Sequence, residues 1–440
     1  MFVKGNDGRA SKKARDRQFA NSKRCFVGLM LMITFAYYYV WTDNDLIAIK
    51  HNFRKSTNRE QINLTPQIIS AKNLERIAPV LDGSVQLISI HVAKLVTKRS
   101  APEYYDGIEA EFCAVDWKEY KQAPWKLPMY RDLLSRSENC RSGRIVVNLK
   151  ELMEEVRDFD TRSSTRAGIK SLEPNFIFHE SRCGSTLLAN SIQYSDPDKN
   201  RVYTEAGPPL SALRICGENY EHCSTNVAST IFRDVIYLMG RVPSHSSESR
   251  LFFKMQAASA ISIDIVQKTF PKAPWVFIYR DPVEVMVSHL NIPHMERAKC
   301  LQSRRHPPHR IKTYLDENHL SMKDMSQEEF CAMYLSSICQ SILDIIKSSG
   351  SITTGNVLNY ENVLGNFIEL LPRHFQLTLS SDEIRRMEFA STIYSKARDK
   401  DLKWTEDSQS KQDSASNEIH RASLDYLAFT YTQLENIKNN

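Results

Sequence analysis

The sequence predicts an α/β fold with a parallel sheet and crossover helices, preceded by one N-terminal transmembrane helix. Short apolar segments that fit buried strands each run into a segment with helical spacing, which is how parallel strands are connected. The hydrophobic and charged contents, 42% and 25%, are ordinary for a globular protein. An uncharged run of seventeen residues, 25–41, lies near the beginning of the chain and is just long enough to span a membrane.

Residues 25–41, CFVGLMLMITFAYYYVW, end in aromatic side chains, which are typical where a span meets the membrane interface. Residues 1–24 carry eight Lys or Arg against two acids, so we expect this tail to stay in the cytosol. The run then acts as a retained signal anchor, and the protein is a single-pass type II membrane protein with its bulk in the secretory lumen. A cleaved signal peptide and a buried core helix are the alternatives.

Two features fit an oxidising lumen. Asn63, Leu64 and Thr65 form a glycosylation sequon, which is the basis for expecting a glycoprotein. Seven cysteines outside the apolar run and outside the loop described below are available for disulfides. They are Cys113, Cys140, Cys216, Cys223, Cys300, Cys331 and Cys339. Because the number is odd, at least one thiol is free or bonded to another chain, and the sequence leaves the pairing open.

Composition divides the chain into five parts. Residues 1–24 are a basic tail, 25–41 the anchor, 42–75 a polar stem, 76–172 an accessory N-terminal region and 173–440 the main α/β domain. Strand–helix alternation is clearest in the last part, where the predicted strands are NFIFHE, APWVFIY and NVLNY. In the accessory region, RIVVNLKELMEEVRDF predicts a strand followed by a helix, and SVQLISIHVAKLV a strand. The chain from residue 380 onward is predicted to be helical.

The stretch FIFHESRCGSTLLAN, residues 176–190, leads from a predicted strand through a turn into a helix. Its candidate anion ligands are Arg182, Cys183, Gly184, Ser185, Thr186 and Leu187. The glycine adopts backbone angles that other residues avoid, and the amides after it lie at a helix N-terminus, where anions bind. The serine and threonine hydroxyls are further donors, and the arginine supplies a permanent charge. The lysine of the triphosphate-binding pattern G-x-x-x-x-G-K-[ST] is missing, so the loop fits a single terminal phosphate with a reacting group. An ordinary strand–turn–helix is the alternative.

A second element, VFIYRDPVEVMVS, places Arg280 at the end of a predicted strand. Asp281 fits a helix N-cap, Pro282 the first helical position, and Glu284 the partner in a capping box. Ser288 lies two turns along the helix. Ligands of open α/β sheets collect beyond the carboxyl ends of the strands, so the arginine and Ser288 fit a second phosphate. A capped helix with a solvated arginine is the alternative. Together, the two elements predict a nucleotide with phosphates at both ends of its ribose.

This pair of elements resembles the two cofactor signatures of the sulfotransferase family. The family's 5′-phosphosulfate loop, [K/R]-x-G-[S/T]-[S/T], is matched by residues 182–186, and its 3′-phosphate element by Arg280 and Ser288. The resemblance covers residues 174–365 and includes NYENVLGN, which is similar to the family's Y-E-D-L stretch. It implies a P-loop NTPase-like fold of the sulfotransferase type, with 3′-phosphoadenosine 5′-phosphosulfate (PAPS) as the sulfuryl donor.

The resemblance also implies a branch of the family and a location. Arginine at the first position of the loop is similar to Golgi carbohydrate and protein-tyrosine sulfotransferases. The cytosolic branch carries a late R-K-G…G motif, whereas this chain has no glycine after Gly365. We therefore expect a Golgi membrane enzyme with a lumenal catalytic domain.

Sulfuryl transfer needs a group that stabilises charge on the transferring unit and a base that takes the acceptor's proton. Arg182 and the loop amides suit the first role. Protein-tyrosine sulfotransferases carry a glutamate at a comparable distance from the loop, so the resemblance implies that Glu205 is the base. A strand-end glutamate that caps a turn is the alternative. Lys254 is a weaker candidate for a sulfonate or phosphate contact, with a solvated strand-end lysine as the alternative.

The sequence leaves the acceptor open: a glycan, a protein or a small molecule with a hydroxyl or amine. The net charge is only +6 and is concentrated in residues 1–24, which argues against a nucleic-acid partner. No His, Cys and Asp residues have metal-ligand spacing, so we expect no metal. The basic run at residues 296–312 is either a solvated loop or a surface that steers an acidic acceptor. A P-loop kinase and a non-catalytic lumenal protein that keeps the fold are the alternative functions, and the oligomeric state stays open.

Overall fold

The structure, a computed structural model, describes residues 68–92, 105–163, 168–217, 222–292, 295, 298–348, 354–396, 398 and 402–438. The chain divides into two units, Met1–Thr65 and Pro66–Asn440, and every described residue belongs to the second. The predicted basic tail, the anchor and the sequon therefore lie outside the described residues.

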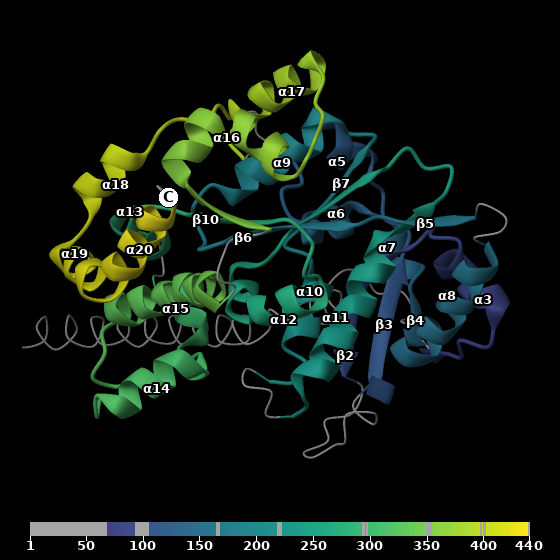
Figure 1. Cartoon of the computed structure of the whole chain (residues 1–440), viewed down its shortest axis with the longest axis horizontal. Helices are drawn as coiled ribbons and strands as arrows, with labels where there is room; N and C mark the ends of the chain where they lie inside the picture. The colour runs from purple at the N-terminus through teal and green to yellow at the C-terminus, as the bar shows by residue number, and fades with distance from the viewer. Residues whose placement is uncertain are drawn as a thin grey trace, which may run out of the picture. The chain divides into compact units, whose positions relative to one another are not determined.

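A five-stranded sheet in the order β11-β10-β6-β9-β7 forms the centre of the second unit (Figure 1), and each neighbouring pair of strands is parallel. Its strands are β6 (Pro174–His179), β7 (Asn200–Thr204), β9 (Arg250–Lys254), β10 (Trp275–Tyr279) and β11 (Gly355–Asn359). The three strands predicted from NFIFHE, APWVFIY and NVLNY are β6, β10 and β11. The predicted α/β fold with a parallel sheet is confirmed.

Helices cover both faces of this sheet (Figure 1). On one face lie α9 (Ser185–Ser195), α16 (Tyr360–His374) and α17 (Ser381–Ser391), and on the other α10 (Gly207–Leu213), α11 (Thr225–Gly240), η1 (Ala257–Ser262), α12 (Ile263–Thr269) and α15 (Gln327–Ser348). The strands send alternate side chains to the two faces. In β6, Ile177 joins the apolar cluster beneath α9 and α16, while Phe176 and Phe178 join the larger cluster on the opposite face.

The connection from β10 to β11 contains further helices. They are α13 (Pro282–Leu290), η3 (Lys299–Arg305), α14 (His309–Glu317) and the long α15. By length and composition, α15 resembles a membrane span, but 67% of its most apolar window is buried inside the protein. A short antiparallel pair, β5 (Ile169–Ser171) with β8 (Arg241–Pro243), flanks the main sheet.

A second, four-stranded sheet in the order β1-β4-β3-β2 precedes the parallel sheet in the chain. Its elements are β1 (Ile68–Ile69), α3 (Leu74–Leu81), β2 (Gln86–Val92), β3 (Ile108–Cys113), α5 (Lys118–Gln122), α6 (Tyr130–Arg136), α7 (Asn139–Ser142), β4 (Ile145–Asn148) and α8 (Leu149–Ser163). The expected strand and helix in RIVVNLKELMEEVRDF are confirmed as β4 and α8, and the expected strand in SVQLISIHVAKLV as β2. Since β1 and the start of α3 fall within residues 42–75, the folded unit begins earlier than the stem boundary we assigned.

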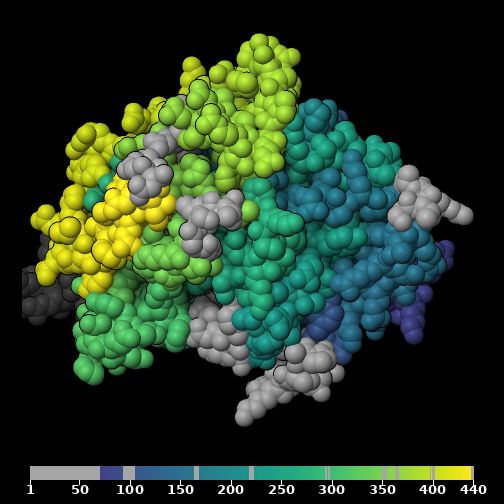
Figure 2. Space-filling view, in the orientation of Figure 1, coloured from purple at the N-terminus to yellow at the C-terminus, as the bar shows by residue number. Residues whose placement is uncertain are grey.

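From residue 380 onward the described chain is mostly helical, as expected, but residues 392–396, 398 and 402–407 between α17 and α18 are not, and they include an isolated bridge between Ile393 and Lys403. The part after this connection folds back over the molecule. It consists of α18 (Ser408–Ser414), α19 (Asn417–Ala422), the π-helical η4 (Ser423–Leu427) and α20 (Ala428–Lys438). Helices α19, η4 and α20 pack against α15, whereas α18 packs against α13, and Figure 2 shows their yellow surface directly beside the green residues of the β10–β11 connection. The segment that leads into α18 thereby reaches the start of α13.

Three disulfides join six of the seven cysteines considered above: Cys113–Cys140, Cys216–Cys223 and Cys300–Cys331. Cys339 is left as a buried free thiol, as the odd number required, and Cys183 is the other free cysteine among the described residues.

Candidate functional site

The candidate residues follow the carboxyl ends of the parallel strands, at one edge of the sheet. The loop with Arg182 follows β6, Glu205 follows β7, and Lys254 is the last residue of β9. Arg280 follows β10, and Tyr360 follows β11. Parallel strands bring their carboxyl ends to the same edge, which is where open α/β sheets bind ligands. The fold therefore gathers at one edge groups that are far apart in the sequence.

The loop after β6 turns through left-handed backbone conformations. Ser181, Arg182 and Gly184 have φ angles of 101°, 57° and 78°. A Cβ atom at Gly184 would collide with the ring of Tyr360, so this position needs glycine for its φ angle and for its close contact. Non-glycine residues with positive φ store strain and are concentrated at ligand sites.

The loop residues differ in which of their hydrogen-bond donors are available to an anion. The Ser185 and Thr186 amides belong to the first turn of α9 and have no carbonyl partner one turn earlier. The Leu187 amide already donates to the carbonyl of Gly184 at 2.9 Å. The Cys183 thiol is buried, donates to the carbonyl of Ile278 at 3.0 Å and is also close to the backbone amides of Ser181 and Ser185, so this side chain is engaged within the protein.

Glu205 and Lys254 form an ion pair between the ends of β7 and β9. The Lys254 side chain is only 1% exposed, and the Glu205 amide donates to its carbonyl at 2.7 Å, which fixes the two residues side by side. Burial is the largest influence and raises the pKa of Glu205, but the charge and hydrogen bond of Lys254, together with smaller contributions from neighbouring His179 and Lys396, lower the pKa to about 2. Glu205 is thus a carboxylate at neutral pH, and the alternative of a solvated Lys254 is wrong.

His179 lies beside this pair, with its Nε2 3.8 Å from the Glu205 carboxylate. The same Nε2 donates to the carbonyl of Met255 at 3.0 Å, and its buried Nδ1 has no hydrogen-bond partner. Burial, and next the charge of Lys254, hold the pKa of His179 well below its usual value, so the ring is neutral.

Two further residues belong to this region: Lys396, which carried no signal in the sequence, and His289, which the sequence suggested lies on a helix surface but which is buried. Burial and the charges of Lys254 and Arg182 lower the pKa of Lys396 to about 8. Burial and the charges of Arg182 and Lys396 lower the pKa of His289 to about 3, and its Nε2 is buried without a hydrogen-bond partner. Arg182, Lys254 and Lys396 therefore gather three cations near one carboxylate, an arrangement that favours an anionic ligand.

Arg280 is buried, with 4% of its side chain exposed, and carboxylates surround it. Its Nε donates to Glu284 Oε2 at 2.5 Å, and its Nη2 donates to Asp407 Oδ1 at 2.8 Å. Its backbone amide donates to buried Glu180 at 3.2 Å. The alternative of a solvated arginine is wrong.

The start of α13 is capped as expected, since the Asp281 side chain accepts from the amide of Glu284. The other hydrogen bond expected for a capping box, from the Asp281 amide to the Glu284 carboxylate, is replaced, because this carboxylate binds Arg280. The predicted capping box is therefore wrong in this respect. Ser288 is half-buried one turn beyond Glu284 on the same side of α13. Arg280, Glu284 and Ser288 thus line one side of this helix.

Tyr360 connects the two predicted anion elements. Its ring lies under the Arg280 guanidinium, 4.1 Å from ring centre to guanidinium carbon, and also fills the space next to Gly184. The indole of Trp404 donates a hydrogen bond to the Tyr360 hydroxyl. The loop and Arg280 are therefore brought together across a single aromatic side chain.

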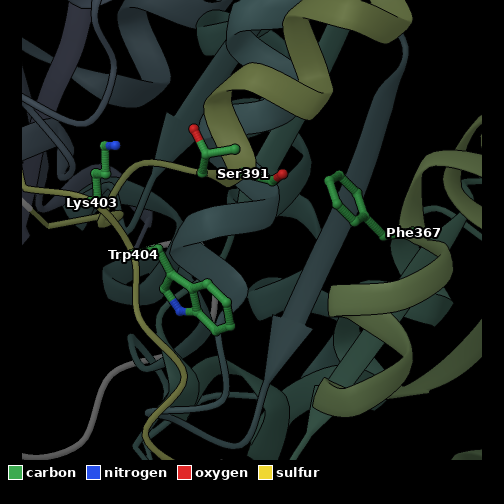
Figure 3. A pocket seen from close by; sticks show the side chains of 5 residues that line it. Phe367, Ser391, Lys403 and Trp404 are labelled. Carbon is green, nitrogen blue, oxygen red and sulfur yellow. The ribbon is translucent and has the colours of Figure 1, made fainter.

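A pocket of about 330 Å³ lies next to this aromatic contact. It is lined by Phe367, Ser391, Thr392, Lys403 and Trp404. Figure 3 shows the Trp404 indole and the Phe367 ring on opposite sides of the opening.

The basic run that we considered for acceptor steering is partly engaged within the protein. Arg304 donates to the carbonyls of Met322 and Met325, and Arg310 pairs with Asp344 at 2.7 Å. No group of three His, Cys, Asp or Glu side chains placed to hold a metal occurs among the described residues.

No protein-family model matches this chain, and no curated protein matches it. Several solved structures are similar to it. A sulfotransferase from Mycobacterium avium has 11% identity and a TM-score of 0.34, over 55% of this chain and 72% of that chain. One from Alicyclobacillus acidocaldarius has 12% identity and a TM-score of 0.31, over 61% of this chain and 96% of that chain.

A mouse sulfotransferase complexed with PAP has 10% identity and a TM-score of 0.30, over 60% of this chain and 85% of that chain. These structural neighbours are sulfotransferases, the family that the two sequence elements resemble. The residue roles proposed below rest on the geometry of this chain.

Proposed function

We propose that this protein is a sulfotransferase that transfers a sulfuryl group from PAPS to a hydroxyl or amine of an acceptor. The observation that carries the proposal is the pairing of two anion-binding elements, the Arg182 loop and Arg280, across the ring of Tyr360. A nucleotide with one charged group at each end of its ribose matches this pairing. The missing lysine of the triphosphate loop argues against ATP.

The loop is assigned to the sulfonated end of the donor. The Ser185 and Thr186 amides at the N-terminus of α9 and the charge of Arg182 are assigned to stabilise negative charge on the transferring group. Lys254 and Lys396 add two positive charges on the side of Glu205. Sulfuryl transfer resembles phosphoryl transfer, in which positioning and charge stabilisation supply most of the catalysis.

Glu205 is assigned the role of general base. With a pKa of about 2 it is ionised, but its pairing with Lys254 makes it a weak proton acceptor. When the Lys254 ammonium turns to the sulfonate, the carboxylate loses its partner and becomes more basic, because burial then dominates. Binding of the donor thus prepares the base for the acceptor's proton.

The nucleotide base is assigned to the pocket beside Trp404. Stacking on an aromatic side chain holds a purine without selecting it by hydrogen bonds. The hydrogen bond from Trp404 to Tyr360 links this pocket to the residue that joins the two anion elements. These contacts support an adenosine that extends from the pocket toward Arg280.

The location follows from sequence features outside the described residues and from the disulfides. The apolar run 25–41 and its basic flank support a type II anchor, and three disulfides fit an oxidising lumen. The Golgi membrane is the proposed site, and a glycan or protein is the proposed acceptor.

The experiment is transfer of label from ³⁵S-PAPS by the purified full-length protein to a panel of glycans, peptides and small alcohols. The expected result is label in at least one acceptor class, lost in Arg182→Met. A kinase would instead transfer label from γ-³²P-ATP to the same panel. No transfer from either donor, together with no binding of adenosine 3′,5′-bisphosphate, would leave the non-catalytic alternative.

A further inference from the structure

Two carboxylates share the Arg280 guanidinium, and they differ in how firmly they are held. Glu284 lies one turn along α13 and its side chain is only 6% exposed. Asp407 comes from the C-terminal segment, just before α18, and half of its side chain, 50%, is exposed. Asp407 is therefore the partner that can leave Arg280 for water.

The Asp407 carboxylate lies between two cations from different elements. Its Oδ1 accepts from Arg280 Nη2 at 2.8 Å, and its Oδ2 lies 2.7 Å from Lys411 Nζ on α18. The Ser408 hydroxyl lies 3.2 Å from the same Arg280 nitrogen. The hydroxyl accepts from this nitrogen and donates to Glu284 Oε2 at 3.1 Å. Only the guanidinium and the ammonium therefore converge on the Asp407 carboxylate, and Ser408 lies beside them. A guanidinium and an ammonium with a hydroxyl nearby are groups that bind a phosphate monoester.

We propose that Asp407 occupies the place of the donor's 3′-phosphate, and that the phosphate displaces it and takes Arg280, Lys411 and Ser408 as its ligands. This inference rests on the proposed function. A phosphate monoester carries close to two negative charges at neutral pH, against one for the carboxylate. The dianion therefore gains more from the two cations, while the half-exposed aspartate regains water.

The exchange makes Asp407 an internal competitor of the 3′-phosphate. Every ligand of this site must first compete with the carboxylate, so the apparent affinity is reduced by the fraction of protein in which Arg280 is still occupied. A nucleotide with a free 3′-hydroxyl has no charge with which to compete and gains nothing here. Arg280 and Lys411 thus favour nucleotides with a 3′-phosphate over AMP, whereas Asp407 weakens the binding of the 3′-phosphate alone and neutralises the two cations when no such nucleotide is bound.

The test is calorimetric titration of the full-length protein with adenosine 3′,5′-bisphosphate and, separately, with AMP. In Asp407→Asn, which keeps a polar side chain of the same size, the bisphosphate Kd is expected to fall by roughly threefold to tenfold. In Lys411→Gln it is expected to rise by roughly tenfold, because a charge-assisted contact is lost. AMP binding is expected to stay unchanged in both. Asp407→Ser serves as a second variant, in case the asparagine perturbs the segment.

Arg421→Gln is the matched control, because Arg421 forms a comparable i,i+4 pair with Asp425 on the neighbouring helical stretch. It is expected to bind both nucleotides as the wild type does. If the wild type binds the bisphosphate more tightly than AMP but Asp407 and Lys411 variants leave both Kd values unchanged, the inference is overturned and the proposed function stands. Equal tightening of both nucleotides in Asp407→Asn also overturns it. Failure of the wild type to bind the bisphosphate overturns both.

Discussion

The buried ammonium group of Lys254 pairs with the Glu205 carboxylate where two neighbouring parallel strands end. Lys254 is almost fully buried, so its charge depends on this partner. Glu205 itself has a φ angle of 52°, which is uncommon for a residue other than glycine. The backbone of Glu205 is therefore strained at the edge of the sheet where the proposed reaction takes place. The electrostatic coupling between Glu205 and Lys254 can be tested directly.

Removing the charge of Lys254 is expected to change the pH dependence of activity. The pKa of Glu205 is depressed to about 2 in the folded protein, so the carboxylate and its pair persist until the pH falls toward that value. In Lys254→Met burial loses its main opponent, although the charge of Lys396 remains, and the pKa should rise by about 1–3 units. An acid limb should then appear in kcat/KM at measurable pH. Lys170→Met, a partly buried lysine on another strand, is the control, and an unchanged profile in Lys254→Met would contradict the pairing.

Replacing the proposed base is expected to separate catalysis from binding. Glu205→Gln keeps the size of the side chain but cannot accept a proton, so kcat should fall by about 10²–10⁴. Binding of adenosine 3′,5′-bisphosphate should change by much less, since the charge contacts to the nucleotide remain. Glu361→Gln, an exposed residue on α16, serves as the control. Full activity in Glu205→Gln would exclude this residue as the base.

Lys396 is expected to set an alkaline limit on nucleotide binding. With a pKa of about 8, it is charged below that pH and loses its charge above it. Affinity for adenosine 3′,5′-bisphosphate should therefore decline as the pH rises through about 8. Lys396→Arg should move this decline to higher pH, because arginine stays protonated, whereas Lys347→Arg should not. If the affinity of Lys396→Arg and of Lys347→Arg declined at the same pH, a group other than Lys396 would be responsible for the decline.

Gly184 and Tyr360 are expected to be energetically coupled. Gly184→Ala puts a methyl group against the Tyr360 ring at a φ angle of 78°, so the free energy of unfolding should fall by about 1–3 kcal/mol. In a Tyr360→Ala background the steric part of this cost should vanish, leaving only the backbone part. Urea denaturation of the four proteins in the cycle measures the coupling. Strict additivity would mean that the ring does not constrain the loop.

The elements around the loop were predictable because their signals are local. The apolar run of β6, the glycine turn and the helical spacing of α9 lie within one short stretch of chain, and β10 with α13 repeats the pattern. A parallel sheet then brings the ends of these strands together, which is why the sequence alone predicts Arg182, Glu205 and Arg280 at one edge.

The remaining part of the site could not be predicted, because it depends on contacts between distant parts of the chain. Lys396, Asp407 and Lys411 lie in a polar, helix-rich segment with no motif, and only its packing beside α13 and the loop gives them neighbours. The burial of Lys254 could not be predicted for the same reason, because it too depends on contacts between distant parts of the chain. A sequence pattern reports the charge of such residues, but their surroundings are set by tertiary packing.

The central claim is that two anion-binding elements, the Arg182 loop and Arg280, bind a nucleotide with phosphates at both ends of its ribose. The most direct measurement is the set of dissociation constants of the full-length protein for adenosine 3′,5′-bisphosphate, AMP and ATP–Mg²⁺. We predict that the bisphosphate binds at least about tenfold more tightly than AMP, a difference of about 1.4 kcal/mol, and that ATP–Mg²⁺ binds more weakly than the bisphosphate. Equal affinity for the bisphosphate and AMP, or preference for ATP–Mg²⁺, would contradict the claim.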